Sequence, residues 1–466
     1  MGLRAARRPP LATKGAVVSR IGEHAVVMGA GMSGLLVARV LSEFYRTITV
    51  VERDALPDTP VARKGVPQGR HLHSCLSRGS QVLGELFPGL LDELAEAGAV
   101  VIDDGDLSRI HAQIGPYELN RTGRFADPAA LVLHLASRPF LEFHVRRRVQ
   151  MLDNVTFLDN QDVVEPVVTA RAVTGVRVVD RDGAAVEQRA DLVVDATGRA
   201  SRTPALLESL GYPRPAEDHT AVNWAYSSQL MSITEGRIVE RMAMVNPGVG
   251  KPRALLVAYE HGQWMLAIGR SADAGPPPTD FAGMLAAAEE VMPPTIAAGL
   301  RTAEPLAEVA IFRNATGVWR RYDQMTRFPA GLLVVGDAWC SLNPVYGQGM
   351  TMAALEALAL RDCLRAGGTD LARRSFHAAA EHIGPAWSRN RASDGGSTQA
   401  RNSRSVARRL RRWTVKAALQ AASTDVKLAE QLLRVNNLVD PPTRLQGRAL
   451  LPRIIVGKLR RPVNIR

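Results

Sequence analysis

The chain has 466 residues, enough for two or three domains, and a hydrophobic content of 46%, which is typical of globular rather than disordered proteins. No apolar run approaches the ~20 residues of a membrane-spanning helix, and three scattered cysteines argue against a disulfide framework or a zinc site, so we expect a cytoplasmic protein. The net charge of +12 resides in the last fifth of the chain: residues 371–466 carry 20 Lys and Arg against 5 Asp and Glu, and the preceding 370 residues carry 38 against 41.

A βαβ unit is predicted near the start of the chain. The first strand, Ala25–Met28, leads into a glycine-rich turn and a helix from about Ser33 to Glu43. A second strand, Ile48–Val51, ends in Glu52. The turn, Gly29–Gly34, reads Gly-x-Gly-x-x-Gly, and its place between a strand and a helix is typical of a dinucleotide site.

Each glycine of this turn has a physical task. Gly29 allows the tight turn, Gly31 lets a pyrophosphate approach the backbone, and Gly34 lets the helix and the strand pack closely. The free N–H groups and the dipole of the helix N-terminus favour the phosphates. Glu52 stands at the end of the second strand, where an acid hydrogen-bonds ribose hydroxyls.

A long loop and a sheet-rich segment are predicted in the middle of the chain. Residues 54–74 are basic and rich in Pro and Gly, too long for an ordinary connection, and are interpreted as a functional loop. Further helices and short strands are predicted at 76–87, 138–149, 163–164, 175–179 and 192–194. A separate sheet is predicted within 220–325, with a helix at 281–291 and a hairpin of 254–259 and 264–268 that turns at His261-Gly262.

The far end of the chain indicates which dinucleotide binds. A buried strand at 331–335 delivers Gly336-Asp337, Pro344 bends the chain, and Gly347 and Gly349 open a helix at 351–364. Small residues there let backbone N–H groups reach a flavin ring, and a helix N-terminus stabilises the negative charge of a reduced flavin. Asp337 would accept hydrogen bonds from the ribityl chain. These residues together predict FAD.

The two glycine-bearing segments resemble those of the class A flavoprotein monooxygenases, the fold of the aromatic hydroxylases and squalene epoxidase, over about the first 365 residues. The resemblance implies that Gly29, Gly31, Gly34 and Glu52 hold the ADP half of FAD. It places Arg53 and Arg138 near the cofactor. It assigns the flavin half to Asp337, Pro344, Gly347 and Gly349.

A narrower likeness concerns residues 63–73 and 343–349, which look most like those of flavin epoxidases in polyether polyketide assembly. One segment departs from the hydroxylases: residues 195–202 read Asp-Ala-Thr-Gly-Arg-Ala-Ser-Arg, and Thr197 stands where the family has an aspartate. This departure leaves open how a nicotinamide docks and whether the enzyme reduces its own flavin.

The expected fold is α/β: a Rossmann-like FAD-binding domain of the glutathione-reductase type, with an inserted mixed β-sheet substrate domain and a helical C-terminal region. The FAD-binding domain is expected in two parts, 20–200 and 327–366. The substrate domain is expected at 201–326 and a basic helical region at 367–466.

The resemblance implies a monooxygenase. NAD(P)H or a reductase would reduce FAD, and O₂ would form a flavin hydroperoxide that epoxidises or hydroxylates a hydrophobic polyketide-, isoprenoid- or phenol-type substrate. Two alternatives stay open: a flavin reductase of isoprenoid double bonds, and a non-catalytic flavin-binding scaffold. No catalytic side chain, metal site or nucleic-acid site is predicted.

Three further features have alternative interpretations. The histidines His71 and His73 either face the flavin or pack the loop, and four side chains of the sheet either line a substrate pocket or form core: Trp224, Tyr226, Met231 and Trp264. A basic amphipathic helix is predicted from Arg401, Arg404, Arg408 and Arg412. It either docks on the protein or contacts a membrane surface or partner.

Overall fold

A computed structural model describes residues 20–220, 224–248, 250–271, 274–313, 316–394 and 415–446 of the chain. Its centre is a five-stranded sheet in which every pairing is parallel. The strands lie in the order β20 (Leu332–Val334), β11 (Leu192–Asp195), β1 (Gly22–Met28), β2 (Tyr45–Val51) and β7 (Val155–Leu158). The expected α/β fold with a parallel sheet is confirmed.

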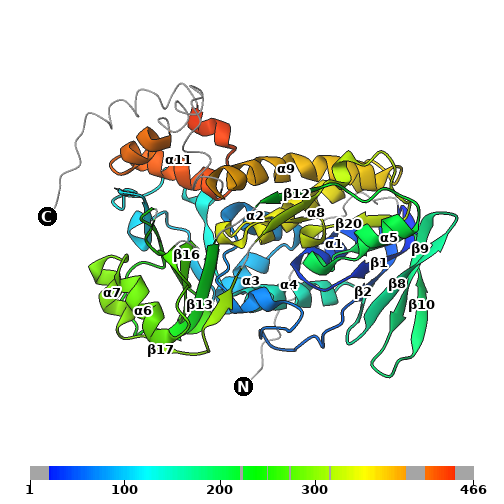
Figure 1. Cartoon of the computed structure of the whole chain (residues 1–466), viewed down its shortest axis with the longest axis horizontal. Coiled ribbons are helices and arrows are strands. Elements are labelled where there is room, and N and C mark those ends of the chain that lie inside the picture. Colours follow the sequence, from blue (N-terminus) through cyan, green and yellow to red (C-terminus); the bar gives the residue numbers. More distant parts are fainter. Residues whose placement is uncertain are drawn as a thin grey trace, which may run out of the picture.

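The strands of this sheet are almost wholly apolar because both faces are covered. Alternate residues such as Val27 and Val194 face helices, whereas Val26 and Val193 face a second, three-stranded antiparallel sheet. That sheet projects at the right of Figure 1 and comprises β8 (Asp162–Thr169), β9 (Ala172–Val179) and β10 (Ala185–Arg189). The parallel sheet is therefore the middle layer of three.

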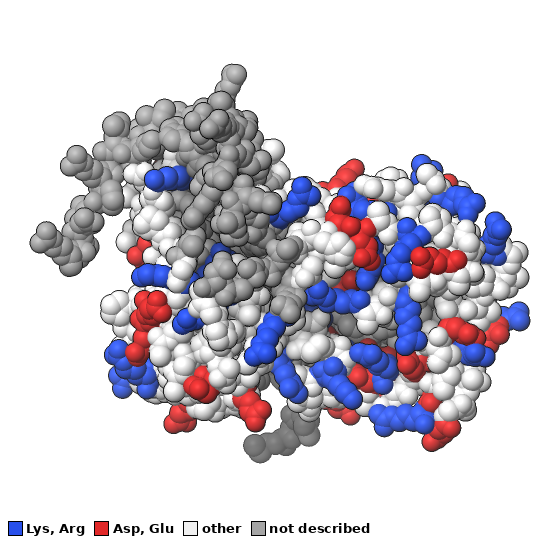
Figure 2. Space-filling model, in the orientation of Figure 1, with Lys and Arg blue, Asp and Glu red and all other residues white. Residues whose placement is uncertain are grey.

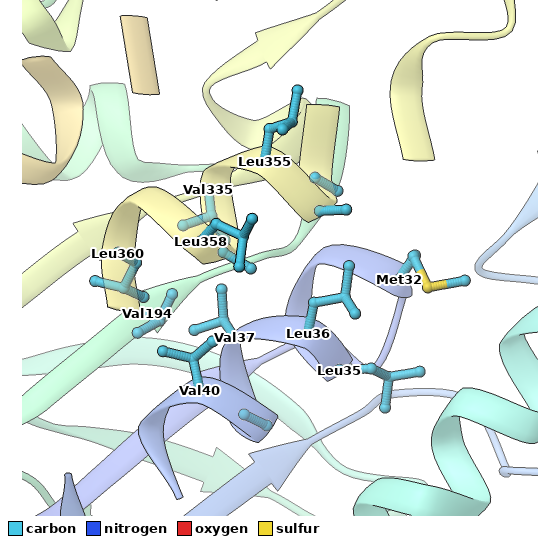
Figure 3. Close-up of a cluster of buried hydrophobic side chains, with 14 of the residues drawn as sticks. Met32, Leu35, Leu36, Val37, Val40, Val194, Val335, Leu355, Leu358 and Leu360 are labelled. Atoms are coloured by element: carbon cyan, nitrogen blue, oxygen red, sulfur yellow. The ribbon is translucent and has the colours of Figure 1, made fainter. Parts of the chain in front are cut away.

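The helical layer joins segments from both ends of the chain. In Figure 3, Leu36 and Val40 of α1 pack toward Leu358 and Leu360 of α8, over Val194 of the sheet. The helices of the layer are α1 (Met32–Leu41), α2 (Ser77–Leu86), α3 (Leu90–Glu96), α4 (Arg138–Gln150), α8 (Gly349–Arg365) and α9 (Leu371–Asp394). The short helix α5 (Thr203–Ser209) follows β11.

A larger, mixed sheet forms the other half of the molecule. Its order is β17 (Glu304–Pro305), β13 (Trp224–Ser232), β16 (Gln263–Ser271), β15 (Arg253–Ala258), β14 (Met242–Asn246), β4 (Ile110–Ile114) and β5 (Tyr117–Glu118), and β18 (Ala310–Phe312) also pairs with β13. One face packs against α6 (Phe281–Glu289) and α7 (Pro294–Leu300), at the lower left of Figure 1. The opposite face is turned toward the parallel sheet.

The predicted hairpin of this sheet is confirmed. β15 and β16 pair antiparallel, and the turn between them places His261 at φ 56° and Gly262 at φ 73°. Strands β4 and β5 come from residues 110–118, far upstream, and β4 joins β14 in parallel. The sheet thus draws on both sides of residue 200, while the domain limits given above stay a prediction.

Two small sheets complete the strand inventory. β12 (Glu217–Thr220), β19 (Gly317–Arg320) and β21 (Cys340–Ser341) form one, and β3 (Val100–Ile102) and β6 (Leu133–Leu135) form the other. The first links the sheet-rich segment to the chain that follows β20, so both halves of the molecule meet there.

The C-terminal helices dock on the protein. Residues 415–422 are helical, and α11 (Val426–Asn436) follows them. Alanines and leucines of both helices form a buried cluster with residues from 107–131, on the β4–β5 side of the large sheet. The predicted basic helix, with Arg401, Arg404, Arg408 and Arg412, lies outside the described residues. On the face in Figure 2, the basic and acidic side chains of the described part are interspersed.

Candidate cofactor and active site

A cavity of about 350 Å³ opens at the carboxyl ends of β1, β2 and β11. In α/β folds, ligands bind at this edge of the sheet. Nine of the ten predicted site residues line it: Gly29, Gly31, Glu52, Arg53, Arg138, Asp337, Pro344, Gly347 and Gly349. Residues more than 300 positions apart in the sequence therefore surround one space, although the role of each stays a prediction.

The tenth residue, Gly34, lies beneath the turn and does not line the cavity. A Cβ atom on Gly34 would come within 1.9 Å of the carbonyl oxygen of Gly29, so helix and strand pack too closely for any side chain. At Gly31, by contrast, a Cβ atom would meet no protein atom within 4 Å. The protein itself does not require glycine at Gly31, so the open space there fits a bound pyrophosphate.

Glu52 ends β2 and is held by the backbone of the same turn. Its Oε2 accepts a hydrogen bond from Ala30 N at 2.8 Å, and its Oε1 accepts one from Asp54 N at 3.0 Å. The side chain is buried and also lines the cavity. Its position at the end of β2 fits an acceptor for ribose hydroxyls.

The opposite wall is built by the segment after β20. Burial raises the pKa of Asp337, which lines the cavity, and raises the pKa of the buried Glu356 to about 8. Glu356 Oε2 accepts a hydrogen bond from Gly336 N at 2.7 Å, so α8 fixes the loop that carries Asp337. Gly336 has φ 62°, a left-handed conformation that favours glycine.

Gly347 and Gly349 bring backbone N–H groups to the same wall. Gly347 has φ 63°, and a Cβ atom on either glycine would meet no protein atom within 4 Å. Between them, Gln348 is buried and accepts a hydrogen bond from Asn390 of α9 at 3.1 Å. The N-terminus of the 17-residue α8 starts here, and its partial positive charge fits an electron-rich ring system.

Asp195 lines the cavity, although the sequence alone assigned it no role. It is buried, and its carboxylate accepts hydrogen bonds from Thr197 N, Thr197 Oγ1, Ser201 Oγ and Thr203 Oγ1 at 2.5–2.9 Å. Thr197, where the hydroxylases have an aspartate, thus anchors the turn. The spacing of hydroxyl residues after Asp195 was a signal that could have indicated this.

No sequence pattern marked the other residues that line the cavity. Gln161 and the first residues of β8 reach the cavity from the three-stranded sheet, and Arg202 reaches it from the turn before α5. Arg63, in the loop at 54–74, does not line the cavity, but it is buried and binds three acidic side chains. Its importance depends on tertiary contacts, which the basic composition of the loop did not specify.

The two histidines of the loop at 54–74 were expected either to face the flavin or to pack the loop, and they occupy different positions. His73 lines the cavity, whereas His71 packs against the large sheet, where its Nδ1 lies 3.1 Å from Ser228 Oγ and its ring meets Tyr226 edge-on. Burial lowers the pKa of each to about 4. Both are therefore neutral near pH 7, and this part of the site presents uncharged rings.

The four predicted sheet residues lie on two different faces of the large sheet, because successive side chains of strand β13 point to opposite sides. Tyr226 faces the loop and stacks on Phe312 at 5.1 Å, and Trp224 lies under the guanidinium of Arg253. Met231 lies on the opposite face and is buried with Trp264 against the helices α6 and α7. The pocket interpretation is therefore wrong for Met231 and Trp264, which are core residues.

Comparisons with known proteins agree with this geometry. No family model matches the chain. Protein Rv3254 of Mycobacterium tuberculosis is 38% identical over 458 residues, 94% of each chain. A kynurenine 3-monooxygenase of Salinispora arenicola is 26% identical over 75% of this chain and 74% of its own length. Among solved structures, PqsL of Pseudomonas aeruginosa, described as a probable FAD-dependent monooxygenase, matches with a TM-score of 0.61 at 15% identity, over 88% of this chain and 99% of PqsL.

The chain belongs to one family with Protein Rv3254, and it shares the fold of FAD-dependent monooxygenases such as PqsL, which supports the predicted resemblance to class A. These likenesses are consistent with an FAD-dependent oxidoreductase. The narrower likeness to polyether epoxidases stays a prediction. Within the described residues, no helix combines the length and the apolarity needed to cross a bilayer.

Proposed function

We propose that this monooxygenase transfers one atom of O₂ to a hydrophobic polyketide-, isoprenoid- or phenol-type substrate, by epoxidation or hydroxylation, with NAD(P)H as the electron donor. FAD, when bound, would supply the oxygen activation: NAD(P)H gives two electrons, one oxygen atom enters the substrate and the other leaves as water. The observation that carries the proposal is the single cavity shared by the Gly29–Gly34 turn, Glu52 and the Asp337–Gly349 segment.

The ten predicted residues would divide the cofactor between them. Gly29, Gly31 and Gly34 with Glu52 would hold the ADP half, and Arg53 and Arg138 would face the phosphates. Asp337, Pro344, Gly347 and Gly349 would hold the flavin half. The layered parallel sheet with β8–β10 supports an FAD domain of the glutathione-reductase type.

The proposed substrate class follows from the side of the cavity that faces the large sheet. Leu72 and the neutral His73 line it, and behind them lie His71, Tyr226 and Phe312 in mutual ring contact. Uncharged rings favour an apolar or aromatic substrate over an ion, since burying an unpaired charge there is costly.

The test is O₂ uptake by the FAD-loaded protein with NADPH or NADH, screened against polyenes, isoprenoids and phenols. We expect some member of the panel to stimulate O₂ uptake and to gain one oxygen from ¹⁸O₂. Reduction of a substrate double bond without O₂ would instead identify a reductase. A bound flavin that no donor reduces and no substrate reoxidises would favour the scaffold.

A further inference from the structure

Arg63 is at the centre of a buried network of charged side chains. Its Nη1 lies 3.3 Å from both Glu52 Oε2 and Asp54 Oδ2, and its Nε and Nη2 donate to Glu142 Oε1 at 2.9 and 2.5 Å. Its side chain is only 4% exposed. One guanidinium therefore binds three carboxylates away from bulk solvent.

The network joins two residues that line the cofactor cavity, Glu52 and Arg138. On one side, Arg63 Nη2 donates to the carbonyl oxygen of Ala30 at 3.1 Å, within the glycine-rich turn whose N–H binds Glu52. On the other side, Glu142 Oε2 accepts hydrogen bonds from Arg138 at 3.0 and 3.1 Å. Arg63 thereby connects the predicted ribose acceptor to the arginine on α4 that lines the cavity.

The charges of the network depend on one another. Burial alone would raise the pKa of Glu142, but Arg138 and Arg63 hold it below its ordinary value. Without Arg63, Glu142 would keep its ion pair with Arg138, whereas Glu52 and Asp54 have no other ion pair in the described part of the chain. Negative charge would then accumulate beside a pyrophosphate that is itself anionic, and removing one partner of a buried ion pair is costly.

We propose that Arg63 is the positioning residue of the FAD site: it holds Glu52 and the Gly29–Gly34 turn in register with Arg138 and neutralises the acids behind the pyrophosphate. Arg63 lines no part of the main cavity, so it acts through Glu52 and Arg138 rather than by touching the cofactor. The inference rests on the proposed FAD site.

The experiment compares FAD release from the wild-type holoenzyme and from Arg63→Met, measured as free-FAD fluorescence on dilution. We expect the Kd of Arg63→Met to rise by at least ~30-fold, because a buried ion-pair partner is lost beside the pyrophosphate.

The matched control is Arg146→Met. Arg146 is also buried on α4 and donates to the carbonyl of Pro57 in the same loop, yet no ion pair or hydrogen bond joins it to Glu52, Asp54 or Glu142 in the described part of the chain. We expect this control to change the Kd by less than about 3-fold.

The pH dependence separates positioning from general destabilisation. The groups that face Arg63 are Glu52 and Asp54 from the end of β2, and Glu142, Arg138 and Arg146 from α4. In Arg63→Met, Glu142 loses one of the two arginines that hold its pKa below the ordinary value, so it takes up a proton more readily, and the ratio of variant to wild-type Kd should decrease as the pH is lowered from 8 to 6. A purely structural defect would leave that ratio unchanged.

The outcomes distinguish failure of the proposed function from failure of the positioning role of Arg63. If wild type binds no FAD, the proposed function and this inference both fail. Tight, wild-type-like binding by Arg63→Met would overturn the inference alone, as would equal losses in Arg63→Met and Arg146→Met. If Arg63→Met does not fold, Arg63→Lys replaces it: a lysine keeps the charge but cannot bind three carboxylates, so an intermediate Kd with the same pH trend supports positioning, and a wild-type Kd refutes it.

Discussion

Gly31 and Gly34 have different roles in the same turn, and substitutions distinguish these roles. A valine at Gly31 would enter open space, and Gly31 has φ −74° and ψ 175°, which valine also adopts. We therefore expect Gly31→Val to fold with wild-type stability in the absence of FAD and to bind no FAD, because the side chain occupies the space for the pyrophosphate. Thermal unfolding of the FAD-free protein and flavin content measure the two effects.

Gly34→Ala is the matched control for this variant. Its Cβ atom would lie 1.9 Å from a backbone oxygen, so α1 must move away from β1, and we expect a loss of ~3 kcal/mol or more in the free energy of unfolding. A Gly31→Val protein that retains full FAD content would contradict the placement of the pyrophosphate. A stable Gly34→Ala protein would contradict the packing of the turn.

Single residues were predictable where local backbone chemistry requires them. The position of Gly31 and Gly349 at the cavity could be predicted, because close approach of backbone to a ligand would require glycine at a fixed spacing. Arg63 and Asp195 could not, since each draws its meaning from partners that folding brings together, such as Glu142 for Arg63 and Thr203 for Asp195. For Met231 the sequence left a pocket and a core position open, because an apolar side chain is equally suited to either face of a strand, and the structure places it in the core.

Among the elements, the C-terminal helices offer the clearest test. Leu428 of α11 is fully buried in the cluster with residues from 107–131, whereas its neighbour Lys427 is exposed. We expect Leu428→Ala to lower the free energy of unfolding by ~3 kcal/mol and Lys427→Ala to leave it nearly unchanged, as measured by urea denaturation.

Removal of the whole segment extends this test. A chain that ends at Asn402 loses both helices of the cluster and exposes its apolar partners, so we expect aggregation or loss of cooperative unfolding. A truncated chain that folds and keeps its FAD would show that the C-terminal helices serve a separate role, such as contact with a membrane surface or a partner.

Elements were predictable where the period of hydrophobicity is strong. The helices at 138–150 and 349–365 and the hairpin of β15 and β16 were anticipated within a few residues. β2 begins at Tyr45 rather than Ile48, because Tyr45 pairs with Gly22 and is buried although polar residues follow it. Strands β4 and β5 were missed, since β4 pairs with the distant β14 and the two-residue β5 pairs only with β4.

At the scale of the whole molecule, the fold brings the two ends of the flavoprotein unit together. β20 pairs with β11, and α8 packs on α1, so that the segment after residue 331 completes a sheet begun at residue 22. The sequence indicated this assembly because both segments carry glycine-rich turns suited to one cofactor. The route of the intervening chain through the other sheets depends on long-range pairing that no local pattern specifies.

FAD binding is tested most directly by the identity and amount of flavin bound to the purified protein after reconstitution. The flavin would be released by heat, identified by chromatography and mass, and counted against protein concentration. We expect one FAD per wild-type chain and no FAD in Gly31→Val. No retained flavin, or FMN in place of FAD, would contradict the central claim that the Gly29–Gly34 turn and the Asp337–Gly349 segment enclose a single FAD.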